Sequence, residues 1–216
     1  MTFTQALGIR KGITAIIGSG GKTSLMLALA TELASPQCFR FPSVVLCTST
    51  KIYPPEGIPL VERISERVEG ILCVGTPALQ GKIGAPQQDI SELSQYADYV
   101  LVEADGSKHL PLKAHEVYEP VIPESCDRII LVIGATGIGK PVEEAVHRSE
   151  IFTRLTGSLI ATAEAVALAV EKEGYGDIVF INQADSAPQE ARALSGLLQK
   201  PTCVGSVQKG EIICLY

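Results

Sequence analysis

Short apolar runs alternate along the chain with longer stretches in which apolar side chains recur at helical spacing. The runs are rich in β-branched residues and have few polar interruptions, which is typical of strands covered on both faces of a parallel sheet. The pattern therefore predicts a sheet of short, buried strands. The predicted strands are residues 13–17, 44–47, 71–74, 99–102, 128–133, 178–181, 202–207 and 212–215.

Helical periodicity fills several of the intervals between these strands. Gly174 follows one apolar helical stretch and is expected to cap its carboxyl end. Ser186 and Gln189 form a capping-box pattern, and Pro188 suits the first turn of the helix that they open. The predicted helices are residues 23–34, 162–172 and 187–198.

The alternation of strands and helices predicts an α/β fold with a doubly wound, mostly parallel sheet in a three-layer sandwich. The length of 216 residues fits one domain over residues 1–216, because single domains reach roughly 250 residues. Two irregular segments, 54–59 and 106–123, follow predicted strands. Open α/β sheets bind their ligands at such strand ends.

Composition and charge exclude several classes of protein. Hydrophobic residues make up 46% of the chain, which is enough to fill a core and argues against intrinsic disorder. The 18 basic and 24 acidic residues give a net charge of −6, which argues against nucleic-acid binding. No apolar run is long enough for a membrane span, and the N-terminus lacks the apolar stretch of a signal peptide. We expect a cytoplasmic protein that binds neither nucleic acid nor membranes.

The cysteines and histidines do not indicate a metal site. No two cysteines form a C-x-x-C pair, so buried, reduced thiols are expected rather than disulfides or metal ligands. His109 and His115, with Glu116, also lack tight metal-ligand spacing. The six cysteines are Cys38, Cys47, Cys73, Cys126, Cys203 and Cys214.

The strongest chemical signal is a glycine-rich turn between the first predicted strand and helix. Glycines allow successive backbone N–H groups to surround a phosphate, and the helix N-terminus adds its positive dipole end. In such a P-loop, Lys22 would contact the β- and γ-phosphates and the Thr23 hydroxyl would bind Mg²⁺. The loop is a shortened variant, because Ile16 stands where the common pattern has its first glycine. The predicted phosphate-binding residues are Gly18, Ser19, Gly20, Gly21, Lys22, Thr23 and Ser24.

Two other glycine patterns are weaker candidates. Gly18 and Gly20 could begin a dinucleotide fingerprint, but its third glycine position holds Thr23 and no acid ends the second strand, so NAD is rejected. Residues 134–140 satisfy G-x-x-x-x-G-K and follow a strand. The next residue is Pro141, which has no hydroxyl for a metal, so this segment is expected to flank the site.

An apolar strand ending in Glu103 and Asp105 has the form of a Walker B element. One carboxylate would hold Mg²⁺ and the other would orient an attacking water, and spacing does not decide between them. We take Lys22, Glu103 and Asp105 as candidate catalytic residues, and Thr23 with Asp105 as candidate metal ligands. Lys108 and Lys113 follow closely and either neutralise phosphate or are surface lysines.

Two further strand ends carry polar residues. Thr50 and Lys51 follow the second strand and form either a sensor of the γ-phosphate or an ordinary turn. Asn182 and Asp185 follow a late strand in the N-x-x-D pattern with which GTPases read guanine. Arg148, next to His147, either stabilises phosphate charge or is a surface arginine.

Eight segments of the sequence, which include the glycine-rich turn, the two acids and the N-x-x-D pattern, follow one another in the same order as in the YqeC family. The chain therefore resembles this family, whose members are described as accessory proteins of selenium-dependent molybdenum hydroxylases. The resemblance implies a partner that is such a hydroxylase or its cofactor. The family often has lysine where this chain has Gln183, and in GTPases that lysine packs on the base, so guanine affinity is expected to be weaker here. The matching segments are residues 18–24, 50–55, 102–108, 111–113, 119–123, 139–141, 146–148 and 182–185.

The leading hypothesis is a Mg²⁺-dependent P-loop NTPase that favours GTP over ATP and assists maturation of a molybdenum- or selenium-dependent hydroxylase. One alternative is a nucleotide-dependent switch or cofactor carrier with little turnover of its own. Another is an ATP-dependent ligase or kinase acting on a small acid, because short G-x-x-G-K-T loops also occur in amide ligases.

Overall fold

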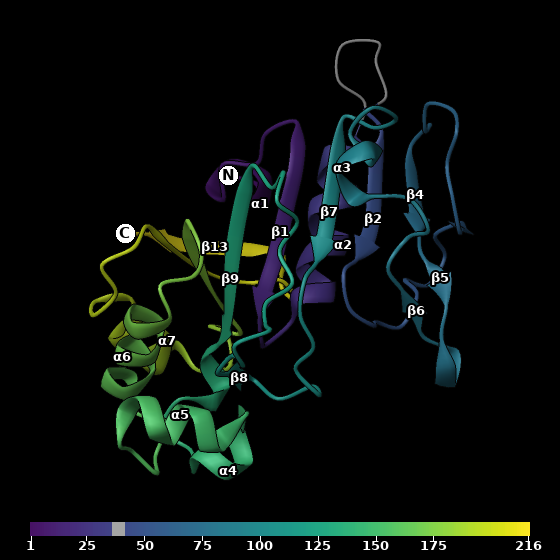
Figure 1. Ribbon diagram of the computed structural model, residues 1–216. Helices are drawn as coiled ribbons and strands as arrows, with labels where there is room; N and C mark the ends of the chain where they lie inside the picture. Colours follow the sequence, from purple (N-terminus) through teal and green to yellow (C-terminus); the bar gives the residue numbers. More distant parts are fainter. Residues whose placement is uncertain (36–41) are drawn as a thin grey trace.

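The computed structural model describes residues 1–35 and 42–216. Nine of its strands form one sheet, in which neighbours run parallel except for one antiparallel pair at the edge. Figure 1 shows the central strands side by side. The strand order is β13 (Glu211–Leu215), β12 (Thr202–Ser206), β11 (Ile178–Asn182), β9 (Arg128–Gly134), β1 (Gly12–Gly18), β7 (Tyr99–Glu103), β2 (Val44–Thr48), β4 (Ile71–Val74) and β3 (Leu60–Val61).

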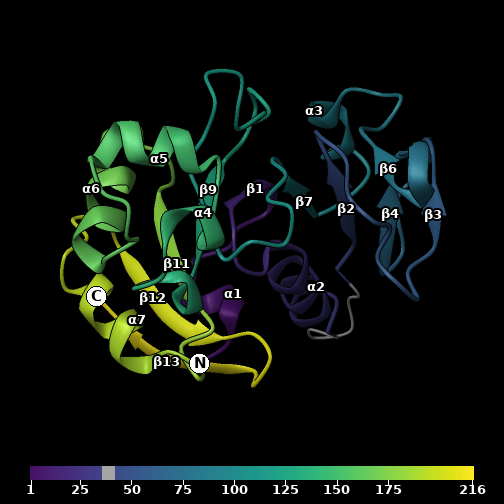
Figure 2. The same ribbon diagram turned by 90° about the horizontal axis from the view of Figure 1, so that it is seen from below.

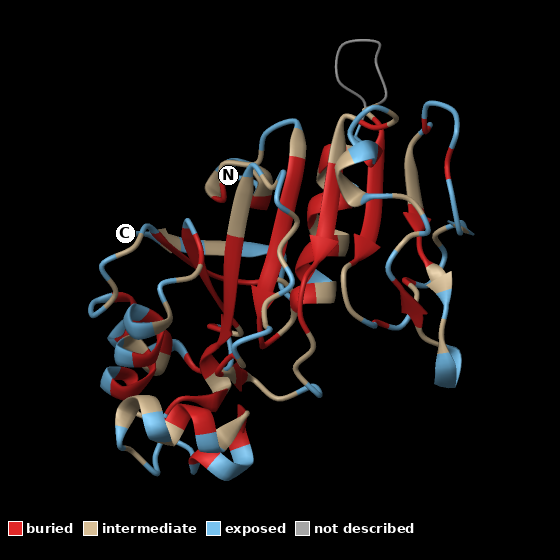
Figure 3. Ribbon diagram, in the orientation of Figure 1, coloured by how far each residue is buried: buried red, intermediate tan, exposed pale blue. Residues whose placement is uncertain are grey.

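Helices cover both faces of this sheet. Side chains alternate along each strand, so Ile16 of β1 packs on one face while Ala15 and Ile17 pack on the other. The first face is covered by α1 (Phe3–Ala6) and α2 (Lys22–Leu33). The opposite face is covered by α3 (Ile90–Leu93), α4 (Val142–Ala145), α5 (Ser149–Thr156), α6 (Ala163–Glu173) and α7 (Pro188–Ser195). Figure 2 shows α2 separated by the sheet from α5 and α6, and Figure 3 shows the buried central strands between them.

The predicted fold is confirmed: the sheet is mostly parallel and lies in a doubly wound three-layer sandwich of the P-loop NTPase-like kind. Each predicted strand is present. Gly174 caps α6 in the left-handed conformation, as predicted. The capping box is wrong, because Ala187 is the N-cap of α7 and the Ser186 hydroxyl bonds to Asp185 instead. Pro188 does occupy the first turn.

Several short elements have too few residues to show a hydrophobic period, and the sequence pattern did not reveal them. Two 3₁₀ turns are η1 (Leu79–Gly81) and η2 (Ala135–Gly137). The short strands form two small ladders, β5 (Thr76–Pro77) with β6 (Ile83–Gly84) and β8 (Leu112–Lys113) with β10 (Val146–His147).

Three of the five described cysteines are buried, as predicted. Cys47, Cys73 and Cys203 are free and buried, and burial raises the pKa of the Cys73 thiol to about 11. Cys126 and Cys214 are free and half-buried, and Cys38 lies outside the described residues. Within those residues, no helix combines the length and the apolar character needed to cross a bilayer.

Candidate functional site

The turn between β1 and α2 depends on two glycines. Gly20 has φ +95°, and a Cβ there would lie 2.3 Å from the backbone nitrogen of Gly134. Gly21 has φ +116°, and its Cβ would lie 2.5 Å from Nδ2 of Asn182. Any larger residue would therefore clash and be strained. The segment 134–140 does flank this turn, as expected.

The turn presents a series of free donors. The N–H groups of residues 20–24 have no hydrogen-bond acceptor in the described part of the chain, whereas the N–H of Leu25 donates to Gly21 O at 2.9 Å. Gly21 is the N-cap of α2 and provides no side-chain cap. Because free N–H groups at a helix N-terminus attract negative charge, the turn is suited to an anion.

Lys22 lies beneath the turn with its side chain only 2% exposed. Its Nζ donates to Gly18 O at 2.8 Å and to Ser107 Oγ at 3.2 Å. The same ammonium is 3.1 Å from Asp105 Oδ1 and 3.7 Å from Glu103 Oε1. Both candidate carboxylates therefore converge on the lysine that the sequence singled out.

The structure distinguishes the two carboxylates by their partners. The Thr23 hydroxyl donates to Glu103 Oε2 at 2.7 Å, and both residues border the open cleft. Asp105 is fully buried, and its Oδ2 accepts the N–H of Gly18 at 2.8 Å. Glu103, and not Asp105, is therefore the carboxylate beside Thr23. The reason is that β7 ends at Glu103, after which the chain turns Asp105 under the loop.

The pKa values of the two acids shift in opposite directions. Burial raises the pKa of Glu103, although Lys22 and the Thr23 hydroxyl oppose the shift. Burial also acts against ionisation of Asp105, but His115, Lys22 and Lys113 outweigh it and hold its pKa below the ordinary range. Asp105 is therefore a buried anion with structural partners.

His115 and Glu173 extend this network away from the turn. His115 Nε2 is 2.9 Å from Asp105 Oδ2, and its Nδ1 is 2.8 Å from Glu173 Oε2 on α6. Burial alone would lower the pKa of His115, but the hydrogen bonds to Asp105 and Glu173 raise it. The histidine joins the turn to α6 by side-chain contacts. Among residues 1–35 and 42–216, no group of three or more His, Cys, Asp or Glu side chains is arranged to hold a metal ion.

Lys113 is buried rather than on the surface. Its Nζ donates to Gly106 O at 2.6 Å and lies 3.1 Å from Glu119 Oε2. Glu119 also approaches Arg148, whose Nη2 is 3.6 Å from Oε1 and donates to the Tyr118 hydroxyl at 3.1 Å. Arg148 is therefore held by its neighbours and is not a free surface arginine.

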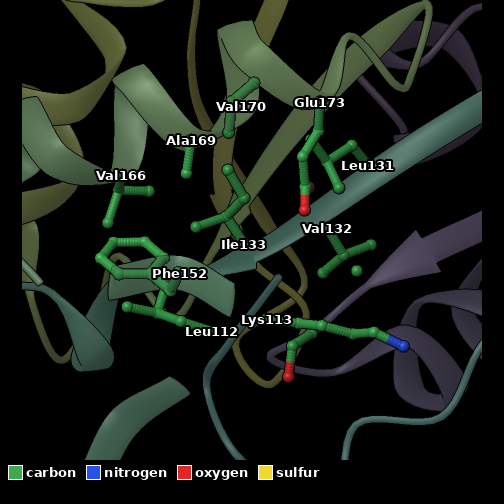
Figure 4. A pocket seen from close by; sticks show the side chains of 12 residues that line it. Leu112, Lys113, Leu131, Val132, Ile133, Phe152, Val166, Ala169, Val170 and Glu173 are labelled. Atoms are coloured by element: carbon green, nitrogen blue, oxygen red, sulfur yellow. The ribbon is translucent and has the colours of Figure 1, made fainter. Parts of the chain in front are cut away.

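The sequence did not single out the roles of His115, Lys113 and Glu173. Figure 4 shows Lys113 and Glu173 beside a small apolar pocket under α5 and α6. Its volume is about 20 Å³, room for one water at most, so it is not a nucleotide site.

The late strand end is also tied to the turn. Asn182 Nδ2 donates to Gly20 O at 2.8 Å, and its Oδ1 accepts the N–H of Val207 at 3.0 Å. Asp185 is exposed, and a hydrogen bond from Ser206 lowers its pKa. Ser206 also ends a strand, β12, so the strand-end reasoning that found Asn182 would have found it.

An open cleft lies beside the turn. It has a volume of about 600 Å³, and its floor includes residues 20–24 and Glu103. Lys51 lines it, whereas Thr50 bonds through its N–H to the Thr48 hydroxyl at 3.0 Å. The Thr48 hydroxyl in turn donates to Glu103 O at 2.7 Å. Thr50 is therefore connected to the backbone of Glu103 through Thr48 and is not part of the cleft lining.

The chain is similar to known proteins. The sequence profile described as YqeC protein matches residues 14–150, which contain the glycine turn, both acids and His115. The chain belongs to the YqeC family. An uncharacterized YqeC protein of Escherichia coli (strain K12) is 30% identical over 222 residues, covering 94% of this chain and 82% of the relative. The YqeC profile ends before Asn182 and Asp185, so the residues of the late strand end lie outside that match.

Proposed function

We propose that this chain binds a nucleoside triphosphate as its Mg²⁺ complex at the turn between β1 and α2, and hydrolyses it. The observation that carries the proposal is the set of free N–H groups at residues 20–24, at a helix N-terminus and beside the ammonium of Lys22. Triphosphate oxygens would accept these donors, as in other P-loops. Asp105, already engaged by His115 and Lys113, would remain anionic when Lys22 turns to the phosphates.

The residues present fit a magnesium ion. The Thr23 hydroxyl and the Glu103 carboxylate are 2.7 Å apart at the cleft wall and supply the oxygen ligands that Mg²⁺ prefers. When bound there, the ion would neutralise charge on the phosphate oxygens. Glu103 would hold the ion either directly or through water, and Thr23 would orient that carboxylate.

The late strand end supports a preference for guanine. A carboxylate at Asp185 can accept both the ring N1–H and the 2-amino group of guanine, whereas adenine offers no such pair of donors. Asn182 joins Gly20 to Val207, so the strand end that would carry the base contact is tied to the phosphate-binding turn. The Gln183 side chain accepts a hydrogen bond from the Thr136 hydroxyl at 2.5 Å, and its backbone has φ +64°. Because this bond holds the side chain, Gln183 would pack on the base less well than a lysine.

Membership of the YqeC family supports a role as an accessory factor. We propose that nucleotide hydrolysis drives a step in the maturation of a molybdenum- or selenium-dependent hydroxylase, with the hydroxylase or its cofactor as partner. This part of the proposal rests on the family resemblance and not on the geometry of the site.

Isothermal titration with Mg·GTP and Mg·ATP, followed by phosphate release, tests the nucleotide proposal. Lys22→Met should weaken binding at least about a hundredfold, since two charge-assisted hydrogen bonds contribute about 3 kcal/mol or more. Lys140→Met is the matched control, because Lys140 is exposed in the flanking glycine segment, and it should change affinity less than about twofold. Absence of binding by the unmodified protein, or equal losses in folded forms of both variants, would refute the proposal.

A further inference from the structure

The cleft extends beyond the phosphate-binding turn, and its far walls are basic. One wall follows β2 and includes Lys82, the residue before β6, and the other follows β7 and includes His147 of β10. In Figure 1, β6 and β8, the partner strand of β10, lie on either side of the carboxyl ends of β1 and β7. The basic residues on these walls are Lys51, Lys82, Lys108, His109 and His147, against the acids Glu103 and Glu119.

The proposed nucleotide leaves the β2 side of this cleft free. Asn182 and Asp185, the proposed base contacts, follow β11, whereas Lys51 follows β2. In the sheet order β11-β9-β1-β7-β2, these strands are four spacings apart, or about 19 Å. A nucleotide with its base beside β11 and its phosphates over β1 would point its γ-phosphate toward the basic walls.

His147 lies in the cleft wall that follows β7, and its imidazole ring makes no hydrogen bond to the described residues. Its residue is only 8% exposed, and its backbone oxygen accepts the N–H of Ala114 at 3.0 Å. Its ring nitrogens make no hydrogen bond to residues 1–35 and 42–216, and the residue lines the cleft. Burial, together with the charges of Lys113 and Arg148, lowers the pKa of His147. Neither ring nitrogen belongs to the buried unpaired atoms of the described residues, so the imidazole is open to the cleft and can donate to or accept from a ligand there.

The opposite wall is held in place by the backbone. Ile52 and Ile83 exchange hydrogen bonds of 3.0 and 2.8 Å, which brings Tyr53 next to Lys82. The Lys82 ammonium lies 5.2 Å from the centre of the Tyr53 ring. This lysine is thus positioned beside an aromatic face at the cleft wall.

The wall after β7 carries backbone strain. Lys108 and His109 have φ values of +49° and +63°, a conformation that residues with side chains rarely adopt. Two such residues in succession cost conformational free energy. Backbone strain of this kind is common in ligand-binding segments.

We propose that the basic part of the cleft binds a second small molecule, an anion bearing carboxylate or phosphate groups, between Lys82 and Tyr53 on one wall and His147 and Lys108 on the other. The position would place this anion next to the γ-phosphate end of the nucleotide. The inference rests on the proposed nucleotide site, because that site defines which part of the cleft remains free.

The test is a two-step calorimetric titration of the full chain at low salt. The protein is first saturated with Mg²⁺ and a non-hydrolysable GTP analogue, and then titrated with glutarate in one arm and glycerol 3-phosphate in the other. Failure of the first step refutes the nucleotide site alone, and the anion titrations are then run on the nucleotide-free protein. We expect millimolar or tighter binding of at least one anion, and the arm that responds identifies carboxylate or phosphate as the preferred group.

Three variants decide whether the anion is in the proposed place. Lys82→Met and His147→Gln should each weaken anion binding about tenfold, the loss expected for one charge-assisted hydrogen bond. Lys11→Met is the control, because Lys11 pairs with Asp98 outside the cleft, and it should leave anion affinity unchanged. Each variant is first titrated with the nucleotide analogue, so that a loss at the first site is detected separately. Binding of neither anion to the folded protein, or equal binding by all three variants, would overturn the proposal.

Discussion

Replacement of Asn182 by alanine should destabilise the protein, although this residue belongs to a motif associated with base recognition. The Asn182 amide bridges two segments far apart in the chain, donating to Gly20 O at 2.8 Å and accepting from Val207 N at 3.0 Å. Asn182 is 5% exposed, so water cannot easily replace it. The variant removes both hydrogen bonds at once and leaves their backbone partners unpaired.

The two partners determine the size of the effect. Gly20 is buried and Val207 is half-buried, so leaving the Gly20 carbonyl unpaired costs more free energy than leaving the Val207 N–H unpaired. An unpaired buried polar group costs about 1–3 kcal/mol, which gives a total of about 2–4 kcal/mol for this pair. For a chain of 216 residues, about 2–4 °C per kcal/mol corresponds to a Tm lower by about 4–16 °C.

Urea unfolding and thermal unfolding, both followed by circular dichroism, measure this change directly. Ser186→Ala is the matched control, because the Ser186 hydroxyl is exposed and bonds only to the neighbouring Asp185 at 3.1 Å. It should shift the free energy of unfolding by less than about 0.5 kcal/mol. If Asn182→Ala unfolds at the same urea concentration as the unmodified protein, Asn182 does not hold the glycine turn, and our account of the bridge fails.

Three further predictions concern the charged groups of the site. Asp185→Asn should weaken GTP binding about tenfold or more. It should also improve binding of xanthosine triphosphate, because the 2-oxo group of xanthine needs a hydrogen-bond donor. A competition assay that shows equal GTP and ATP affinity in the unmodified protein would refute the guanine assignment. Thr23→Val should reduce the gain in nucleotide affinity that Mg²⁺ provides, although Glu103 still holds the ion, and titrations with and without EDTA would reveal this. A magnesium dependence equal to that of the unmodified protein would exclude Thr23 as a ligand. The pKa of His115 is raised in the folded state, so its stabilising contribution is complete below its ordinary pKa of about 6.5 and is lost as the pH rises through the raised value. His115→Gln should therefore lose more free energy of unfolding at pH 6 than at pH 9, and a larger loss at pH 9 would contradict the ion-paired role.

Local patterns in the sequence determined the strands, the glycine turn and the glycine cap of α6. Continuous β-branched runs identify buried strands because side chains on both faces must be apolar, and the structure has strands at each such run. The turn at residues 18–22 was also evident, because glycine, lysine and threonine follow directly from strand to helix. These features depend on neighbouring residues, so a single sequence is enough to predict them.

The partners of each charged group were decided only by the tertiary structure. Glu103 and Asp105 are two residues apart, and spacing could not show that the end of β7 leaves one beside Thr23 and buries the other. His115 meets Glu173 on α6, and Asn182 meets Gly20, because the strand order brings distant segments to one edge of the sheet. The basic cleft has the same origin. Its walls come from the segments after β2 and β7, from Lys82 before β6 and from His147 of β10, and their charges have no common pattern along the chain. Contacts between distant residues depend on which strands are neighbours, and hydrophobic periodicity carries no information about that order.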